Sequence, residues 1–357
     1  MVTSNEIIDR IKASIINSNK LEKIHLHEPY FEGSNAYKYL EECIDTGWVS
    51  SSGKWVTKFE RLISEYTGSK HTIAVSNGTV ALRLSLFLVG VRANNEVIIP
   101  PLSFVATANA ISHLGGSPHF VDIDSETLGM CPDYLDRHLI EIAEMKGDEV
   151  FNKITKRKIA AVVPVHVFGL PAKIQEIKKV CLKWNLPLIE DAAEALGSKI
   201  KVENKLTHCG CFGDIGTISF NGNKIITSGG GGALLTNDDT FGRLARHLSS
   251  TAKVPHPWDF YHDQIAWNDR LPNINAAVGC AEMEKINSKL RSKRLLHAKF
   301  KKYFEDLAEV EIINESNNCE SNYWLNTMRL IGENVEGLKI DILKNAHKLN
   351  IFLRPSW

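Results

Sequence analysis

A single lysine, Lys224, stands in a polar turn between two short apolar runs that are typical of strands. Ser219 precedes the turn, and four consecutive glycines, 229–232, follow it. Glycines leave room for a flat ligand to approach the backbone closely. The pattern predicts a lysine that forms a Schiff base with a carbonyl group. A lone lysine is more often a solvated surface charge, and its place between two strands favours the chemical interpretation.

Three other groups that could bind a ligand follow expected strands earlier in the chain. Gly78 and Thr79 open a helix whose free backbone N–H groups favour an anion, although an ordinary helix cap is the simpler explanation. Phe104 could stack on a planar ring, although an aromatic residue here is more often part of the core. Asp191 ends a buried strand and could keep a heterocyclic nitrogen protonated, although it could also cap a helix.

Together these groups supply, in chain order, an anion site, a ring face, a carboxylate and a lysine. This combination predicts a site for pyridoxal phosphate. Other anion-binding patterns are absent from the sequence, which has no GxxxxGK[ST] and no GxGxxG that opens a helix after a strand. Cys209 and Cys211 form the one close cysteine pair and lack a second pair, so no metal site is expected.

The elements that must position these groups alternate between residues 71 and 191. Short apolar runs at 72–75, 96–100, 119–123, 160–165 and 186–191 read as strands, with amphipathic or apolar helices between them. Such alternation predicts an α/β fold with a mostly parallel central sheet covered by helices. Ligands bind such sheets beyond the carboxyl ends of the strands.

The pattern changes after about residue 250, which indicates two domains. Residues 253–275 are rich in Pro, His, Trp and Asn and read as a long functional loop. We expect an N-terminal arm and a large domain over residues 1–270. A smaller C-terminal α+β domain is expected over residues 271–357.

Composition narrows the class of protein. Lys+Arg and Asp+Glu are both 42, so no basic excess points to nucleic acid or to an anionic membrane. The seven cysteines follow no disulfide framework, and no signal peptide or apolar run of membrane-spanning length is present. The sequence predicts a cytoplasmic protein.

The motifs of the chain resemble those of the DegT/DnrJ/EryC1/StrS sugar aminotransferases, which are fold type I pyridoxal-phosphate enzymes. The motifs that carry the resemblance are Asn77-Gly78-Thr79, Ser103-Phe104-Val105-Ala106-Thr107, Pro164-Val165-His166-Val167-Phe168-Gly169, Glu190-Asp191-Ala192-Ala193, Ser219-Phe220 with Lys224, and Asn268-Asp269-Arg270-Leu271. The similarity extends from about residue 27 to the C-terminus, and the order and spacing of the motifs make it specific.

The resemblance implies specific roles for the residues of the cofactor site. Lys224 would form the Schiff base and shuttle the proton, Asp191 would pair with the pyridine nitrogen, and Phe104 would stack on the ring. The phosphate would be held by Gly78, Thr79 and Ser219.

Other residues would contact the partner subunit or the substrate. Asn268 would reach the phosphate in the neighbouring subunit, which implies a homodimer with shared sites, and Arg270 would meet a substrate anion. Glu194 stands where relatives often have His or Gln near the phenolic oxygen of the cofactor. The remaining expected substrate-binding residues are His166, Ser51 and Gly230, and many relatives have an acidic residue where this chain has Gly230.

Within that family, the chain is most similar to the branch that makes 4-amino sugars for legionaminic acid and bacillosamine. This resemblance implies transfer of an amino group from glutamate to C4 of a UDP-linked 4-keto-6-deoxy-N-acetylhexosamine, in bacterial surface-sugar biosynthesis. It also implies a truncated small domain, since relatives continue beyond Trp357. The alternatives are another nucleotide keto sugar as substrate, or a catalytically impaired or regulatory homologue that still binds the cofactor.

Overall fold

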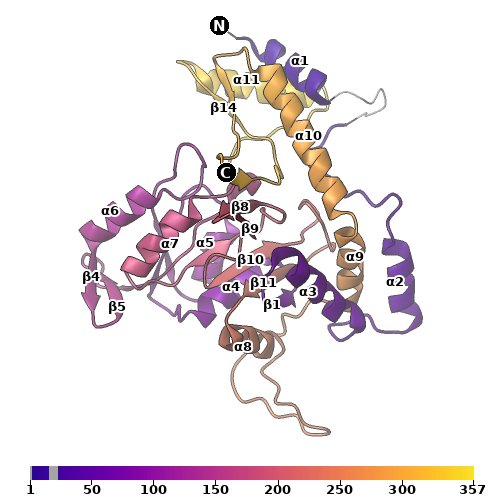
Figure 1. Ribbon diagram of the computed structural model, residues 1–357, viewed down its shortest axis with the longest axis vertical. Helices are drawn as coiled ribbons and strands as arrows, with labels where there is room; N and C mark the ends of the chain where they lie inside the picture. The colour runs from indigo at the N-terminus through magenta and orange to yellow at the C-terminus, as the bar shows by residue number, and fades with distance from the viewer. Residues whose placement is uncertain (1, 16–22) are drawn as a thin grey trace.

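The computed structural model describes residues 2–15 and 23–357, and a central sheet lies at the middle of the larger part (Figure 1). Its strands are β1 (His71–Val75), β2 (Glu96–Ile99), β3 (Ser117–Phe120), β6 (Lys158–Val162), β7 (Ile189–Asp191), β10 (Ile215–Ser219) and β11 (Gly232–Thr236). The hydrogen-bonded order is β1-β11-β10-β7 in one half and β3-β2-β6 in the other. Parallel bridges from Val162 to Leu188 and from Val165 to Asp191 join the halves.

Most neighbouring strands run in the same direction. The pairs β2–β3, β2–β6 and β7–β10 are parallel, and β11 is antiparallel to both of its neighbours. Every residue of β2, β10 and β11 is buried, because helices cover both faces of the sheet. The fold predicted from the continuous apolar runs is confirmed.

Helices surround this sheet (Figure 1). They are α2 (Ala36–Asp45), α3 (Lys54–Thr67), α4 (Gly78–Leu88), α5 (Ala106–Ser112), α6 (Pro132–Ile142), α7 (Ile174–Lys183), α8 (Asp239–Ser249) and α9 (Asn273–Met283), with a short 3₁₀ turn, η1 (Val167–Gly169). A hairpin of β4 (Ala143–Lys146) and β5 (Glu149–Asn152) extends the sheet beside β6. Helix α4 begins where the side chain of Asn77 accepts a hydrogen bond from the N–H of Val80 at 2.8 Å.

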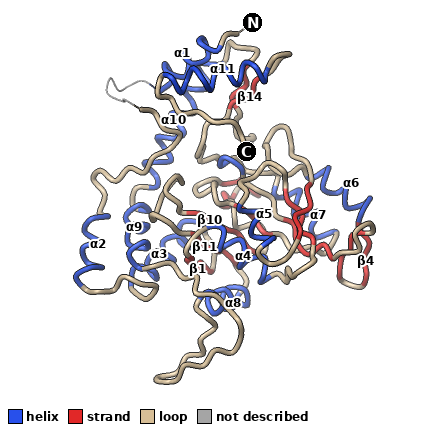
Figure 2. Tube along the Cα trace, turned by 180° about the vertical axis from the view of Figure 1, so that it is seen from behind, coloured by secondary structure: helices blue, strands red, loops and turns tan. Residues whose placement is uncertain are grey.

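A second group of elements lies at one end of the molecule, as Figures 1 and 2 show. It contains α1 (Ser4–Ile15), α10 (Ile286–Phe304), α11 (Val335–Lys348), β12 (Val310–Ile312) and β14 (Met328–Leu330). Ile7, Ile8 and Ile11 of α1 pack with Phe300 of α10 and Ile342 of α11 in a separate apolar core. The domain boundary at residue 270 stays a prediction, and this packing places α1 with the C-terminal elements.

A small sheet connects the two groups. It consists of β8 (Lys199–Val202), β9 (Lys205–His208) and β13 (Cys319–Glu320), with Cys319 opposite Ile200. Neither β8 nor β9 was expected from the sequence. Through this sheet the segment that follows β13 reaches the carboxyl ends of the central strands. No helix in the described residues is long and apolar enough to cross a membrane.

Candidate active site

Two strands of the central sheet end side by side at the site. Asp191 is the last residue of β7 and Ser219 is the last residue of β10, and these strands are parallel with Thr217 opposite Asp191. Side chains at such strand ends share one edge of the sheet, where ligands bind in open α/β folds. The structure therefore brings together residues that are far apart in the sequence.

The turn at Gly78 forms a close backbone cradle beside Ser219. A Cβ atom added to Gly78 would lie 3.0 Å from the Cβ and 3.3 Å from the Oγ of Ser219. One added to Gly232 would lie 2.5 Å from the carbonyl carbon of Asn77. Both glycines are thus needed for this approach, and Thr79 adds a hydroxyl in the first helical turn. Backbone N–H groups at a helix start beside two hydroxyls suit a phosphate.

Asp191 is the buried carboxyl group of the site. Its Oδ2 accepts a hydrogen bond from the Oγ1 of Thr107 at 2.7 Å, and its Oδ1 accepts one from the N–H of Ala193 at 3.1 Å. Burial raises its pKa, and these hydrogen bonds and the charge of Lys224 lower it less strongly. A desolvated carboxyl group of this kind suits a cationic ring nitrogen, which would hold it ionised. Thr107 belongs to the sequence motif 103–107, but no role was expected for it from the sequence.

Lys224 lies against a carboxyl group and an indole ring. Its Nζ is 3.4 Å from the Oε1 of Glu194 and 4.1 Å from the centre of the Trp324 ring. Burial raises the pKa of Glu194, and Lys224 lowers it. The indole N–H of Trp324 donates to the carbonyl of Asn223 at 2.5 Å, which fixes the turn that carries the lysine. Glu194 was expected near the cofactor from the family resemblance, whereas no sequence pattern pointed to Trp324.

A hydrogen-bonded segment of the C-terminal part holds Trp324 in place. The amide of Asn322 donates to the carbonyls of Glu194 at 2.8 Å and Leu196 at 2.9 Å, and its oxygen accepts from the N–H of Trp324 at 2.8 Å. Lys293 of α10 donates to the carbonyl of Trp324 at 2.9 Å. Burial lowers the pKa of Lys293 to about 8. These bonds join the second group of elements to the lysine site.

His166 lies behind the strand ends with both ring nitrogens engaged. Its Nδ1 accepts a hydrogen bond from the N–H of Ala172 at 3.0 Å, so its Nε2 carries the proton and donates to Glu190 at 2.9 Å. His166 and Glu190 have no exposed surface. This geometry does not support the expected contact of His166 with a substrate, because no polar atom of the ring is left for one. It assigns His166 to positioning Glu190.

Phe104 has an accessible ring in the loop between β2 and α5. Its side chain is 51% exposed, and it meets the edge of the Trp357 ring at 6.1 Å between ring centres. Trp357 in turn stacks on Phe168 at 5.0 Å. A free aromatic face beside the strand ends is what the predicted stacking role requires.

The other expected substrate residues lie in loops around this edge. Gly230 is half-buried, and a Cβ atom there would approach only the carbonyl oxygen of Ser76, at 4.0 Å. Ser51 is half-buried in the loop before α3 and is not hydrogen-bonded to Lys224 or Asp191. No contact in the structure tests their roles.

Asn268 and Arg270 lie on the segment that returns to the sheet after the long loop. Asn268 is exposed and forms an antiparallel bridge with Ser250. Arg270 forms an ion pair with the buried Glu60 at 3.5 Å, and its Nε is buried without a partner in the described part of the chain. Burial lowers the pKa of Arg270. Glu60 was not identified from the sequence.

The combined features fit pyridoxal phosphate, because the cradle, the buried carboxyl group and the lysine meet at one strand edge. With this fold they define a fold type I pyridoxal-phosphate-dependent transferase. Residues 31–355 match the model of the DegT/DnrJ/EryC1/StrS aminotransferase family, and the chain belongs to that family. The described residues contain no cluster of three or more side chains that could hold a metal ion.

Known relatives resemble the chain over most of its length. GDP-perosamine synthase of Vibrio cholerae is 36% identical over 307 residues, which cover 86% of this chain and 77% of that protein. The aminotransferase TlmJ from Streptoalloteichus hindustanus has a TM-score of 0.82 at 24% identity, with 94% of this chain and 85% of that chain covered. PseC of Helicobacter pylori, an aminotransferase involved in the biosynthesis of pseudoaminic acid, has a TM-score of 0.82 at 23% identity and the same coverage. The two structures show the shared fold, and the names do not single out the legionaminic acid and bacillosamine branch.

Proposed function

We propose that this protein transfers an amino group from glutamate to the C4 ketone of a nucleotide-linked 4-keto-6-deoxyhexose. The observation that carries the proposal is the meeting of Lys224 with Glu194, Asp191 and the Gly78–Ser219 cradle at the carboxyl edge of the sheet. Bound pyridoxal phosphate supplies the chemistry that stores the amino group between donor and acceptor.

The residues of the site have separate tasks in this proposal. Lys224 moves the proton that sets the new stereocentre, since its Nζ lies on a 12% exposed side chain and is sheltered from water. Glu194 orients that amine through the 3.4 Å contact. Asp191 provides the negative charge opposite the ring nitrogen, and Gly78, Thr79 and Ser219 hold the phosphate. Phe104 covers one ring face.

Two sugar nucleotides are candidates for the acceptor. The similarity of residues 27–29, 48–51 and 253–258 to the bacillosamine branch favours a UDP-linked 4-keto-6-deoxy-N-acetylhexosamine. The relatives named GDP-perosamine synthase, at 33–36% identity, favour a GDP-linked sugar. Arg270, Ser51 and Gly230 remain the residues that we expect to contact the acceptor.

We propose a homodimer in which Asn268 reaches the partner's cofactor site. The loop before Asn268 exposes large apolar side chains, with Trp258 80%, Phe260 75% and Ile265 92% exposed. Such a group on one loop is typical of a protein–protein contact.

The seven cysteines are free, which supports a reducing compartment such as the cytoplasm.

Product analysis tests the reaction and the nucleotide together. The purified holoenzyme is incubated with glutamate and either the UDP-linked or the GDP-linked 4-keto sugar, and products are identified by mass spectrometry. We expect an aminated sugar and 2-oxoglutarate from one nucleotide series and no product with Lys224→Ala. A cofactor-loaded protein that aminates neither series would refute the proposal and favour a regulatory homologue.

Mixing two inactive variants tests the shared sites. If Asn268 acts across the interface, Lys224→Ala and Asn268→Ala subunits form mixed dimers with one intact site. Half of the dimers would be mixed, so about a quarter of wild-type activity should return. Activity that stays at the level of the separate variants would place Asn268 in its own subunit's site.

A further inference from the structure

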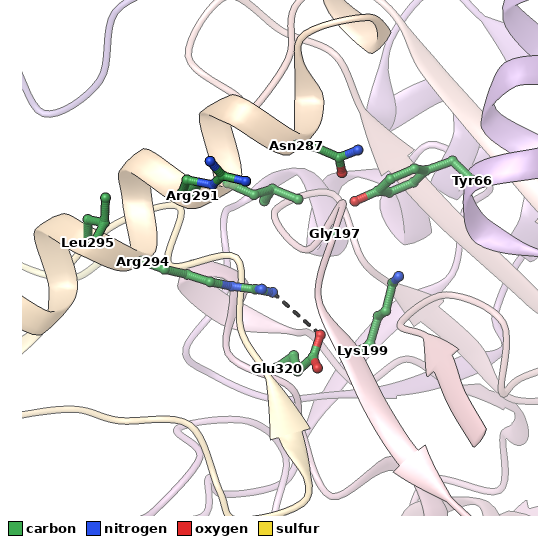
Figure 3. A pocket seen from close by; sticks show the side chains of 9 residues that line it. Tyr66, Gly197, Lys199, Asn287, Arg291, Arg294, Leu295 and Glu320 are labelled. Atoms are coloured by element: carbon green, nitrogen blue, oxygen red, sulfur yellow. Dashed lines mark ion pairs between the residues drawn. The ribbon is translucent and has the colours of Figure 1, made fainter. Parts of the chain in front are cut away.

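A hollow separate from the lysine site lies where α10 crosses the β8 segment (Figure 3). Its volume is about 440 Å³, within the range of small-ligand pockets. Arg291 and Arg294 of α10, Lys199 of β8, Glu320 of β13 and Tyr66 of α3 line it. The hollow is therefore built jointly by the sheet-bearing group and the C-terminal group of elements.

Gly197 keeps the floor of this hollow open. Its φ is +91°, a conformation that favours glycine. A Cβ atom there would lie 2.7 Å from the Cδ1 of Leu290 and 3.2 Å from the hydroxyl of Tyr66. Its N–H donates to the Nε2 of the buried His208 at 2.7 Å, which fixes the turn. A side chain at this position would fill the space between α10 and Tyr66.

The charges around the hollow do not balance. Three cationic groups, Lys199, Arg291 and Arg294, surround a single carboxylate, that of Glu320. Arg294 is oriented by a hydrogen bond from its Nε to the carbonyl of Ser321 at 3.0 Å, and its distance to Glu320 is a long 3.8 Å. Arg291 has no ion-pair partner within the part of the chain that the structure describes. Two positive charges are left over for a ligand.

Lys199 and Tyr66 can both donate hydrogen bonds into the hollow. The Nζ of Lys199 lies 5.5 Å from the centre of the Tyr66 ring, and Figure 3 shows the Lys199 side chain pointing towards that ring. Burial raises the pKa of Tyr66 to about 12, so its hydroxyl stays protonated at neutral pH and can donate. Donors that approach from several elements suit tetrahedral phosphate oxygens better than one planar carboxylate.

We propose that this hollow binds a small phosphorylated ligand through Lys199, Arg291 and Arg294. The ligand is distinct from the cofactor, whose phosphate is assigned to the cradle at Gly78. Because Lys199 lies on the small connecting sheet and Arg294 lies on α10, the ligand bridges these two elements. Bridging strengthens the docking of the segment from Glu320 to Trp324, and this segment ends at the ring below Lys224.

Calorimetric titration of the holoenzyme with inorganic pyrophosphate tests this site. We expect saturable binding that weakens with added salt. Lys199→Gln and Arg291→Gln should each weaken it by about tenfold or more, since each removes a charge-assisted hydrogen bond. Lys299→Gln removes an equal charge from an exposed position on α10, the helix that carries Arg291. This control variant should leave the affinity for pyrophosphate unchanged. All three variants should keep the wild-type circular dichroism spectrum.

Three titration results would contradict this proposal. Absence of pyrophosphate binding to the wild-type holoenzyme would overturn the proposal. Equal binding by wild type, Lys199→Gln and Arg291→Gln would also overturn it, because the anion would then occupy another site such as that of the sugar nucleotide. Succinate that binds as tightly as pyrophosphate would refute the assignment of a phosphate ligand.

Discussion

Replacing the buried Glu190 with Gln should destabilise the fold strongly. The Oε1 of Glu190 accepts hydrogen bonds from the N–H groups of Phe212 at 2.6 Å and Gly213 at 2.7 Å. Its Oε2 accepts from the N–H of Gly210 at 2.8 Å and from His166 at 2.9 Å. One carboxylate thus ties the turn that leads into β10 to the strand β7 that ends at the site.

The size of this destabilisation follows from the number of buried hydrogen-bond donors that lose their acceptor. A glutamine oxygen can keep one pair of these donors, while its NH₂ group faces the other pair. His166 cannot relieve this by changing tautomer, because its Nδ1 already accepts from Ala172. Each buried donor without an acceptor costs about 1–3 kcal/mol, so Glu190→Gln should lower the free energy of unfolding by about 4 kcal/mol.

Urea unfolding of the cofactor-free protein, followed by far-ultraviolet circular dichroism at neutral pH and fixed protein concentration, measures this loss. Glu305→Gln changes an exposed carboxylate and should cost less than about 0.5 kcal/mol. If Glu190→Gln costs no more than Glu305→Gln, the reasoning from its four donors is refuted.

The loss should also depend on pH in a definite direction. Burial acts to raise the pKa of Glu190, but the hydrogen bonds from His166 and the backbone lower it below its ordinary value of 4.5. A group whose pKa is lowered by folding stabilises the protein above that ordinary value, and the stabilisation is lost as the pH falls through the folded-state pKa. The difference between wild type and Glu190→Gln should therefore be constant near neutral pH and shrink in acid. A difference that grows in acid would contradict the sign.

Three further changes test the site itself. Gly78→Ala places a methyl group 3.0 Å from the Cβ of Ser219 and should weaken pyridoxal phosphate binding by about tenfold without unfolding the protein, as measured by fluorescence titration. Trp324→Leu removes the ring below Lys224 and the bond to the turn, so kcat should fall while cofactor content is unchanged; an unchanged kcat would remove Trp324 from the site. Gly230→Ala would approach only the carbonyl oxygen of Ser76, at an ordinary contact distance of 4.0 Å, and should leave the melting temperature unchanged, so any effect should appear in KM for the sugar alone.

The sequence predicts the site best where a residue follows directly on a buried strand. Asp191, Ser219 and Lys224 were predicted to lie near one another because continuous apolar runs place the strand ends, and parallel strands bring those ends together, as the structure shows for Asp191 and Ser219. Trp324 was missed because it joins Lys224 across 100 positions of the chain, through the unpredicted pairing of β13 with β8. No local pattern marks such a contact.

For His166 the sequence pattern was not enough to predict the role of the side chain. A polar residue after an apolar run could face a ligand or a buried partner, and periodicity does not distinguish the two. The structure resolves this through Ala172 and Glu190, which use both ring nitrogens. Whether a histidine at a strand end binds substrate therefore depends on groups that only the tertiary fold brings near it.

Adjacent carboxyl groups at the end of β7 have different roles because successive side chains of a strand point to opposite faces. Glu190 points towards the turn at Gly210–Gly213, and its hydrogen bonds lower its pKa. Asp191 points towards Thr107, and burial raises its pKa. The first carboxylate is satisfied by the protein and holds the strands in register. The second forms no ion pair within the described part of the chain, which leaves it suited to a cationic ring nitrogen. One strand therefore carries both the carboxylate that holds the strands and the carboxyl group that faces the ligand.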